Sequence, residues 1–196
     1  MVKIDSVTEL KDAKFVKPVR INYTLKNKKK TWEAVISHDS VSIVLWHKDK
    51  NALITVKQFR PPVMNKNKTN GYTYELCAGI VDKDTTNIQI AKEEILEECG
   101  YDVDVNTIKE IHTYYTSVGI SGSKQTMYYA QCDDSMKVND GGGLEEEDIE
   151  VVYIKLEDAK EFMINNNFQK TPGLMVGFYW FFENFNKELK TISFKK

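Results

Sequence analysis

Alternating apolar and polar positions dominate the first half of the chain and predict β-strands. Residues 20–25 and 31–37 alternate on either side of a lysine-rich turn at 26–30, as expected for a hairpin with a solvated tip. The other segments that read as strands are 40–46, 52–57, 73–79, 126–132 and 149–155. Pro61 and Pro62 are expected to end regular structure. The polar stretch 65–71 that follows them is expected to be a loop.

Helical periodicity is confined to three segments. Placed at about 100° per residue, residues 88–99 gather Ile88, Ala91, Ile95 and Cys99 on one face. Gly100 then has the residue type that ends helices in the left-handed conformation. Residues 156–165 and a segment that starts at Thr171 are also expected to be helical. Strands, one acidic helix, more strands and then helices indicate an α+β fold rather than regular βαβ alternation.

Composition excludes several classes of protein. The 196 residues carry 27 Lys and Arg against 29 Asp and Glu, a net charge of -2, which argues against a nucleic-acid partner. Nothing approaches 18 consecutive apolar residues and the first residues lack a signal-peptide pattern, so no membrane association is expected. The three cysteines are widely spaced and do not cluster with the histidines. Reduced cysteines in a cytoplasmic protein are therefore expected rather than disulfides or a zinc site.

Four glutamates on the segment 88–99 are the first candidate chemistry. Glu93, Glu94, Glu97 and Glu98 occupy one arc of about 140° beside the apolar face. Like charges four residues apart repel each other by a few tenths of a kcal/mol, roughly. Divalent cations such as Mg²⁺, which prefer oxygen ligands, would neutralise the arc. A solvated acidic face is the alternative.

The surroundings of these glutamates distinguish the two interpretations. Gly79 stands at the head of a pattern in which Glu94, Ile95, Glu97, Glu98, Gly100 and Tyr101 all fall in register. The segment thereby resembles the box of the Nudix hydrolases, Gly-x5-Glu-x7-Arg-Glu-U-x-Glu-Glu-x-Gly-U, where U is apolar or aromatic. Two positions depart from the pattern, because Thr85 stands where an acid is expected and Glu93 where an arginine is expected.

The resemblance extends over most of the chain and is greatest for the ADP-ribose and nucleoside-diphosphate-sugar branch. It implies a Nudix α/β/α sandwich with a mixed central sheet. It also implies an N-terminal antiparallel arm over residues 1–39, a hydrolase domain over residues 40–196, and a homodimer in which the arm helps to build the partner's substrate site. The segments that carry this resemblance are 56–62, 75–79, 97–101, 117–127 and 141–151.

Residue roles follow from the resemblance position by position. Glu94 and Glu98 would bind Mg²⁺, or Mn²⁺, with Glu97 as a further ligand and catalytic candidate and with the backbone carbonyl of Ala78 completing the set. Arg60 would contact the diphosphate, for which a planar guanidinium is suited. A salt bridge from Arg60 to Glu75 remains the alternative.

Two further positions carry binding and catalytic expectations. Trp32, on the arm, would stack on the base of the substrate, although a tryptophan on a strand is otherwise usually part of a core. On the loop 141–148, Glu145 is the first candidate for the base that activates water and Glu147 the second. A solvated acidic loop is the alternative there, and the three glycines at 141–143 are expected to make the loop mobile.

The implied activity is Mg²⁺-dependent hydrolysis of the diphosphate in nucleoside diphosphate sugars. UDP-glucose would yield UMP and glucose 1-phosphate, and ADP-ribose would yield AMP and ribose 5-phosphate. Ser123 replaces the second glycine of a Gly-x-Ser-x-Gly pattern, so a serine hydrolase is not expected. The competing hypothesis is a non-catalytic nucleotide-binding protein on a degenerate box, motivated by Glu93 and Thr85.

Overall fold

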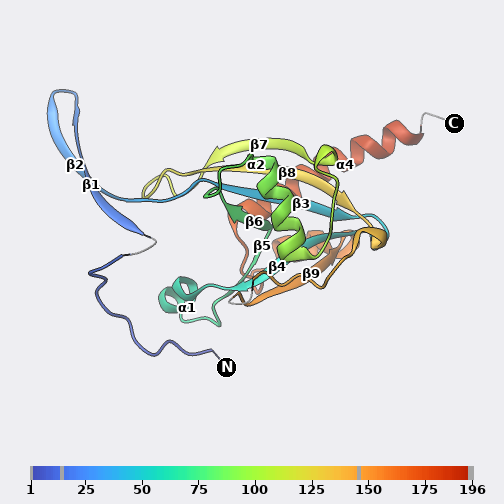
Figure 1. Cartoon of the computed structure of the whole chain (residues 1–196), viewed down its shortest axis with the longest axis horizontal. Helices are drawn as coiled ribbons and strands as arrows, with labels where there is room; N and C mark the ends of the chain where they lie inside the picture. Colours follow the sequence, from blue (N-terminus) through green and yellow to red (C-terminus); the bar gives the residue numbers. More distant parts are fainter. Residues whose placement is uncertain (1, 14–15, 145–146, 194–196) are drawn as a thin grey trace.

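A mixed β-sheet forms the centre of the molecule (Figure 1). The structure is a computed structural model that describes residues 2–13, 16–144 and 147–193, with side chains as far as residue 185. Its elements are β1 (Lys17–Leu25), β2 (Lys28–Ile36), β3 (Ser40–His47), β4 (Ala52–Phe59), α1 (Pro61–Asn67), β5 (Tyr72–Glu75), β6 (Cys77–Ile80), α2 (Asn87–Glu94), β7 (Lys109–Tyr115), β8 (Lys124–Cys132), β9 (Ile149–Lys155), α3 (Leu156–Ile164) and α4 (Pro172–Ser193).

Seven strands pair in this sheet, in the order β5-β4-β3-β8-β7, with β6 beside β3 and β9 beside β4. The β3–β8 pair is parallel and the other pairs are antiparallel. Apolar residues on the two faces of β3 enter two different clusters. Ile43 and Leu45 pack with the α2 side, whereas Val44 packs with α3 and α4. The expected α/β/α sandwich of an α+β protein is therefore confirmed.

The first two strands form a separate sheet that projects from this body (Figure 1). They pair in register from Lys17 opposite Ile36 to Leu25 opposite Lys28. The turn between them places Lys26 and Asn27 at φ 50° and 61°, as a two-residue hairpin turn requires. The predicted hairpin is thus confirmed. None of the helices that the structure describes is long and apolar enough to cross a membrane.

Several predicted boundaries were wrong for identifiable reasons. Pro61 and Pro62 do not end regular structure but occupy the first turn of α1, where a missing N–H costs nothing, and the helix takes in part of the expected loop. The single strand expected at 73–79 breaks at Leu76 into β5 and β6, which pair with different neighbours. Strand β7 was missed because it is an edge strand with mostly exposed, polar side chains.

The acidic helix also differs from an ideal one. Regular α-helix ends at Glu94, and residues Ile95–Cys99 continue as a π-helical turn. Gly100 ends the turn at φ 79°, so the predicted left-handed residue is confirmed. A π-turn holds more residues per turn, so 100° per residue no longer describes its side-chain directions. Glu98 consequently lies on the buried side, together with Ile95 and Cys99.

Candidate functional site

Two glutamates from the acidic helix meet the strand β6 at the edge of the core. Glu98 is only 6% exposed, and its Oε2 accepts a hydrogen bond from the backbone N–H of Ala78 at 2.9 Å. Glu94 lies over Gly79 so closely that a Cβ at that glycine would overlap its carboxylate. The glycine is therefore required because the carboxylate approaches the backbone. The structure thus brings together Glu94 and Glu98, four residues apart on the helix, and the Ala78 backbone that the resemblance had implied beside them.

Burial perturbs both carboxyl groups. It raises the pKa of Glu98 to about 8, opposed by the hydrogen bond from Ala78, and the charges of Glu94 and Glu147 raise it further. Burial also raises the pKa of Glu94 to about 7, with the charge of Glu97 as the next contribution. Burial therefore disfavours the charged form of each carboxylate, and a neighbouring cation would favour it. The oxygen-only donor set therefore fits a hard divalent cation.

Glu97 and Glu93 have separate surroundings. Glu97 lies near enough to Glu94 for its charge to raise the pKa of that carboxyl, and its backbone oxygen accepts the N–H of Gly143. Glu93 forms an ion pair with Lys83 at 2.8 Å, and this contact lowers the pKa of Glu93. The sequence analysis missed Lys83, because the 81–86 loop gives no indication of which side chain turns back to the helix.

Arg60 forms the salt bridge that was the alternative for this residue. Its Nε donates to Glu75 Oε1 at 2.8 Å and its NH2 group to Oε2 at 3.0 Å. The contact raises the pKa of Arg60, and the charges of Glu98 and Glu147 act in the same direction. A guanidinium has five N–H donors, so donors remain after this pairing. The side chain of Arg60 is 45% exposed, and the ion pair holds it beside the glutamate cluster.

The glycine-rich loop packs on the end of the acidic helix. Gly142 N donates to the backbone oxygen of Glu98 at 2.9 Å and Gly143 N to that of Glu97 at 3.1 Å. Gly141 has φ 70°, and a Cβ there would overlap the oxygen of Glu98. The glycines thus permit a close contact, which is a different role from the expected mobility.

The structure describes one of the two candidate bases on this loop. Glu147 is exposed, accepts the N–H of Leu144 at 3.0 Å, and raises the pKa of both Glu94 and Glu98. Glu147 therefore lies near enough to Glu94 and Glu98 to act on them electrostatically. Glu145 lies outside the described residues.

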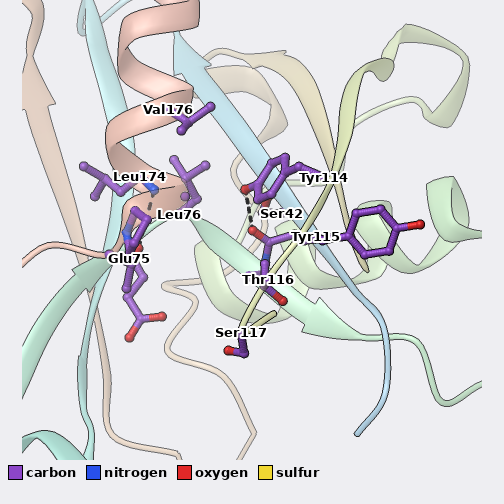
Figure 2. Close-up of a pocket in the computed structure, with 14 residues that line it drawn as sticks. Ser42, Glu75, Leu76, Tyr114, Tyr115, Thr116, Ser117, Leu174 and Val176 are labelled. Atoms are coloured by element: carbon purple, nitrogen blue, oxygen red, sulfur yellow. Dashed lines mark hydrogen bonds between the residues drawn. The ribbon is translucent and has the colours of Figure 1, made fainter. Parts of the chain in front are cut away.

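A pocket of about 520 Å³ adjoins this cluster (Figure 2). Glu75 and Ala78 lie on its wall together with the end of β7 and the start of α4. Tyr114 and Gln125 line it as well, and the Tyr114 hydroxyl donates to Gln125 Oε1 at 2.5 Å. The sequence analysis identified neither residue, because they come together only when β7 and β8 pair and α4 packs beside them.

Trp32 lies on the outer side of the same region. The residue is 52% exposed on β2, so it is not a core residue, and its Nε1 donates to the backbone oxygen of Gly119 at 2.9 Å. A second contact joins Val35 N to the oxygen of Ile120 at 2.9 Å. The arm is thus attached to the loop 116–123, whose first residues, Thr116 and Ser117, line the pocket.

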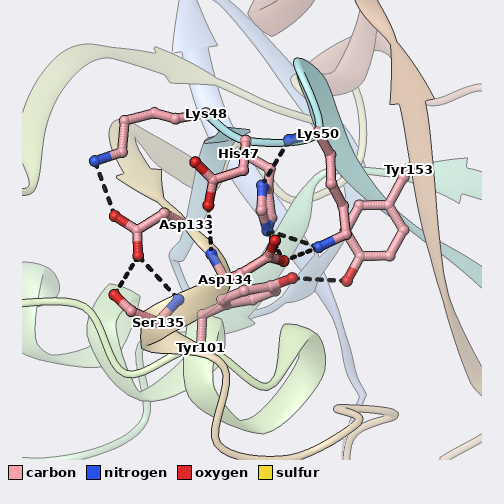
Figure 3. A network of polar contacts seen from close by, with 9 residues as sticks. His47, Lys48, Lys50, Tyr101, Asp133, Asp134, Ser135 and Tyr153 are labelled. Atoms are coloured by element: carbon pink, nitrogen blue, oxygen red, sulfur yellow. Dashed lines mark hydrogen bonds and ion pairs between the residues drawn. The ribbon is translucent and has the colours of Figure 1, made fainter.

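A second group of possible metal ligands lies elsewhere on the molecule (Figure 3). Ligand atoms of His47, Asp49 and Asp134 all lie within 4.8 Å of one another. The Lys50 ammonium contacts Asp134 and lies 3.1 Å from His47 Nε2. Burial lowers the pKa of His47. A lysine therefore contacts this group directly, whereas no lysine or arginine among the described residues forms an ion pair with Glu94 or Glu98.

Comparisons with known proteins agree with this geometry. The model of the NUDIX domain family matches residues 36–172. The chain is 33% identical over 196 aligned residues to the uridine diphosphate glucose pyrophosphatase NUDT14 of Bos taurus, which covers 86% of this chain and 88% of the relative. The Mus musculus protein of the same name gives the same figures. A GDP-mannose pyrophosphatase of Cronobacter sakazakii is 32% identical over 123 residues, 63% of each chain. The chain belongs to the NUDIX domain family.

Proposed function

We propose that this protein is a Mg²⁺-dependent pyrophosphohydrolase that cleaves the diphosphate of nucleoside diphosphate sugars. UDP-glucose would give UMP and glucose 1-phosphate, and ADP-ribose would give AMP and ribose 5-phosphate. One observation carries the proposal: two carboxylates, those of the half-buried Glu94 and the buried Glu98, converge on the backbone of β6 with raised pKa values. The names of the relatives, pyrophosphatases of UDP-glucose and GDP-mannose, support this substrate class.

Glu94, Glu98 and the carbonyl of Ala78 would hold the metal, with Glu97 as a further ligand. Mg²⁺ suits an all-oxygen donor set, and Mn²⁺ would fit the same donors. The bound cation supplies charge neutralisation at the diphosphate and lowers the pKa of water. Occupation would replace the protons that Glu94 and Glu98 otherwise carry near neutral pH.

The remaining steps belong to side chains of the chain itself. Arg60, held by Glu75, would donate its free N–H groups to the diphosphate oxygens. Glu147 would accept a proton from the attacking water, with Glu145 as the competing choice for this base. The water oxygen forms a bond to one phosphorus while the bond from that phosphorus to the bridging oxygen breaks. The other product, sugar phosphate or nucleotide, leaves with the bridging oxygen. No covalent intermediate with the protein is required.

The N-terminal arm is proposed to serve both dimerisation and substrate binding. Residues 1–39 would form a dimerisation arm and residues 40–196 the hydrolase domain, with the exposed ring of Trp32 stacking on the base of the substrate. Ile21, Leu25 and Ile36 on this arm are also exposed, which supports contact with a second copy of the chain. The cytoplasm is the proposed location and no nucleic acid is a proposed partner.

Phosphate-coupled turnover of UDP-glucose and ADP-ribose with Mg²⁺ tests the proposal. We expect turnover by the wild-type chain and a loss of about 100-fold or more in Glu98→Gln, since the amide keeps the shape but loses the charge. No turnover on a broad nucleotide panel would favour the non-catalytic nucleotide-binding alternative. Equal rates for the wild type and Glu98→Gln would instead refute the site assignment.

A further inference from the structure

The pocket beside Ala78 differs in chemistry from the glutamate cluster that it adjoins. Its wall includes one charged side chain, Glu75, which is already paired with Arg60. No lysine, arginine or histidine is among the described residues that line it. A diphosphate would therefore find no countercharge inside the pocket, whereas an uncharged group would bury no unpaired charge.

The pocket wall retains unused hydrogen-bonding capacity. Gln125 donates one N–H to Ser40 and accepts at Oε1 from Tyr114, which leaves one N–H and one lone pair. The Tyr114 hydroxyl donates to Gln125 and can still accept. The Ser117 side chain makes no hydrogen bond to any other described residue, and Thr116 can still accept. Several donors and acceptors from different elements suit a polyol, whose hydroxyl groups point in many directions (Figure 2).

Gly173 leaves the polar atoms of Gln125 and Tyr114 accessible from the pocket because it has no side chain. It lies in the first turn of α4, and a Cβ there would come within 3.1 Å of Gln125 Oε1 and 3.2 Å of the Tyr114 hydroxyl. A side chain at this position would therefore cover the two groups that have free hydrogen-bonding capacity. Its absence keeps them accessible from the pocket.

We infer that this pocket receives the uncharged sugar of a nucleoside diphosphate sugar, with Gln125 as a specificity-determining residue. The inference rests on the proposed function, because it places the diphosphate just outside the pocket, at Arg60 and at the cation that Glu94 and Glu98 would hold. The nucleoside end then lies outside the pocket. Substrates whose sugar carries a carboxylate are disfavoured, since that charge would approach Glu75 with no lysine or arginine of the described wall to compensate it.

Calorimetric titration of UDP-glucose and of UDP, which lacks the sugar, tests this inference. Ca²⁺ is supplied as the divalent ion, and UMP release is followed in the same samples so that turnover is corrected for. Gln125→Leu is expected to weaken the binding of UDP-glucose about 3- to 10-fold, which is the effect of losing hydrogen bonds to an uncharged group. UDP binding is expected to stay within about twofold, because this ligand does not reach the pocket.

Matched variants keep the test independent of folding. Gln131→Leu changes the same residue type on the same strand outside the pocket, and it should leave both ligands unaffected. Gly173→Ala should reproduce the selective loss for UDP-glucose by occupying space alone. Wild-type protein should bind UDP-glucuronate at least about 10-fold more weakly than UDP-glucose.

Three results would overturn the inference. Equal weakening of UDP and UDP-glucose by Gln125→Leu and Gly173→Ala would place the nucleoside in the pocket. An unchanged affinity for UDP-glucose in both variants would show that the sugar does not bind in this pocket. Absence of UDP-glucose binding by the wild type would refute the inference in the same way. Absence of UMP release with Mg²⁺ would count against the proposed function instead, because the two dissociation constants report on the pocket whether or not the ligand is hydrolysed.

Discussion

Glu98 shows how the backbone places a carboxylate where it is unstable by itself. The π-turn brings it to the buried side of the helix, where its side chain accepts a hydrogen bond from the backbone N–H of Ala78. Burial raises the pKa of Glu98 to about 8 and that of Glu94 to about 7. The two side chains therefore bind protons that the same residues in an unfolded chain, with a pKa near 4.5, release.

This difference predicts a pH-dependent stability of the metal-free protein. Between pH 4.5 and 8 the native state binds more protons than the unfolded state, so stability falls as pH rises through this range. Without divalent cations, we expect the melting temperature to fall by roughly 5 °C or more between pH 5 and 8.5. Mg²⁺ should raise it more at pH 8.5 than at pH 5, because the cation competes with the bound protons.

Differential scanning fluorimetry of wild type and Glu98→Gln across this pH range measures the effect. The variant lacks one of the titrating groups, so its melting temperature should fall less steeply with pH and respond less to Mg²⁺. Comparison of the two proteins isolates Glu98 from the other titrating groups. Identical slopes for the two proteins would contradict a raised pKa of Glu98.

At the scale of elements, an ion pair joins the loop 81–86 to the helix α2. The family pattern has an acid in the loop and an arginine on the helix, whereas here Lys83 lies in the loop and Glu93 on the helix. The charges on the loop and on the helix are therefore opposite in sign to those of the pattern. Lys92, the other lysine near the box, pairs with Asp102 at 3.1 Å and does not take this role. The departure at Glu93 thus leaves no unpaired charge.

Charge reversal tests whether the ion pair positions the helix. Lys83→Glu places two carboxylates together and should lower the free energy of unfolding by about 1 kcal/mol, the scale of partly exposed pairs. Glu93→Lys should do the same by opposing two ammonium groups. The double variant restores an attractive pair and should recover most of the loss in stability and in kcat/KM for UDP-glucose. Urea denaturation of the four proteins measures the coupling, and additive losses in the double variant would refute it.

At the scale of the whole molecule, the arm is attached to the body by few contacts. The β1–β2 sheet pairs with no strand of the central sheet, and its described hydrogen bonds to the body run from Trp32 and Val35 to the loop 116–123. Exposed apolar side chains on a two-stranded sheet are costly unless something covers them. A second copy of the chain would cover them without altering the central core.

Removal of residues 1–38 tests the arm as the dimerisation element. We expect the full chain to sediment as a dimer and the shortened chain as a folded monomer, since β3 to β9 form the core without the arm. Sedimentation velocity and far-UV circular dichroism give the two readouts. Trp32→Ala in the full chain serves as the control and should remain a dimer. A shortened chain that still sediments as a dimer would exclude the arm as the main interface.

Local sequence was sufficient to predict the class of fold and the ligand-bearing helix. Period-two and helical patterns located most strands and the helices near 88, 156 and 171, because each element buries one face. Gly79, Glu94 and Glu98 could be grouped in advance through the resemblance to the Nudix box, whose pattern spans both the glycine and the helix. Gly100 was predictable for the same local reason, since its backbone conformation favours glycine.

Only the tertiary structure decided which side chains from distant segments contact each other. The pairing of Glu93 with Lys83 depends on how a loop turns back, and that of Arg60 with Glu75 on which strands become neighbours. The pocket needs β7, β8 and α4 to converge from three distant parts of the chain. The change from α- to π-helix at Ile95 was not indicated by the helical period of the sequence. Patterns along a chain report which side faces the core, whereas contacts between side chains from distant segments exist only after folding.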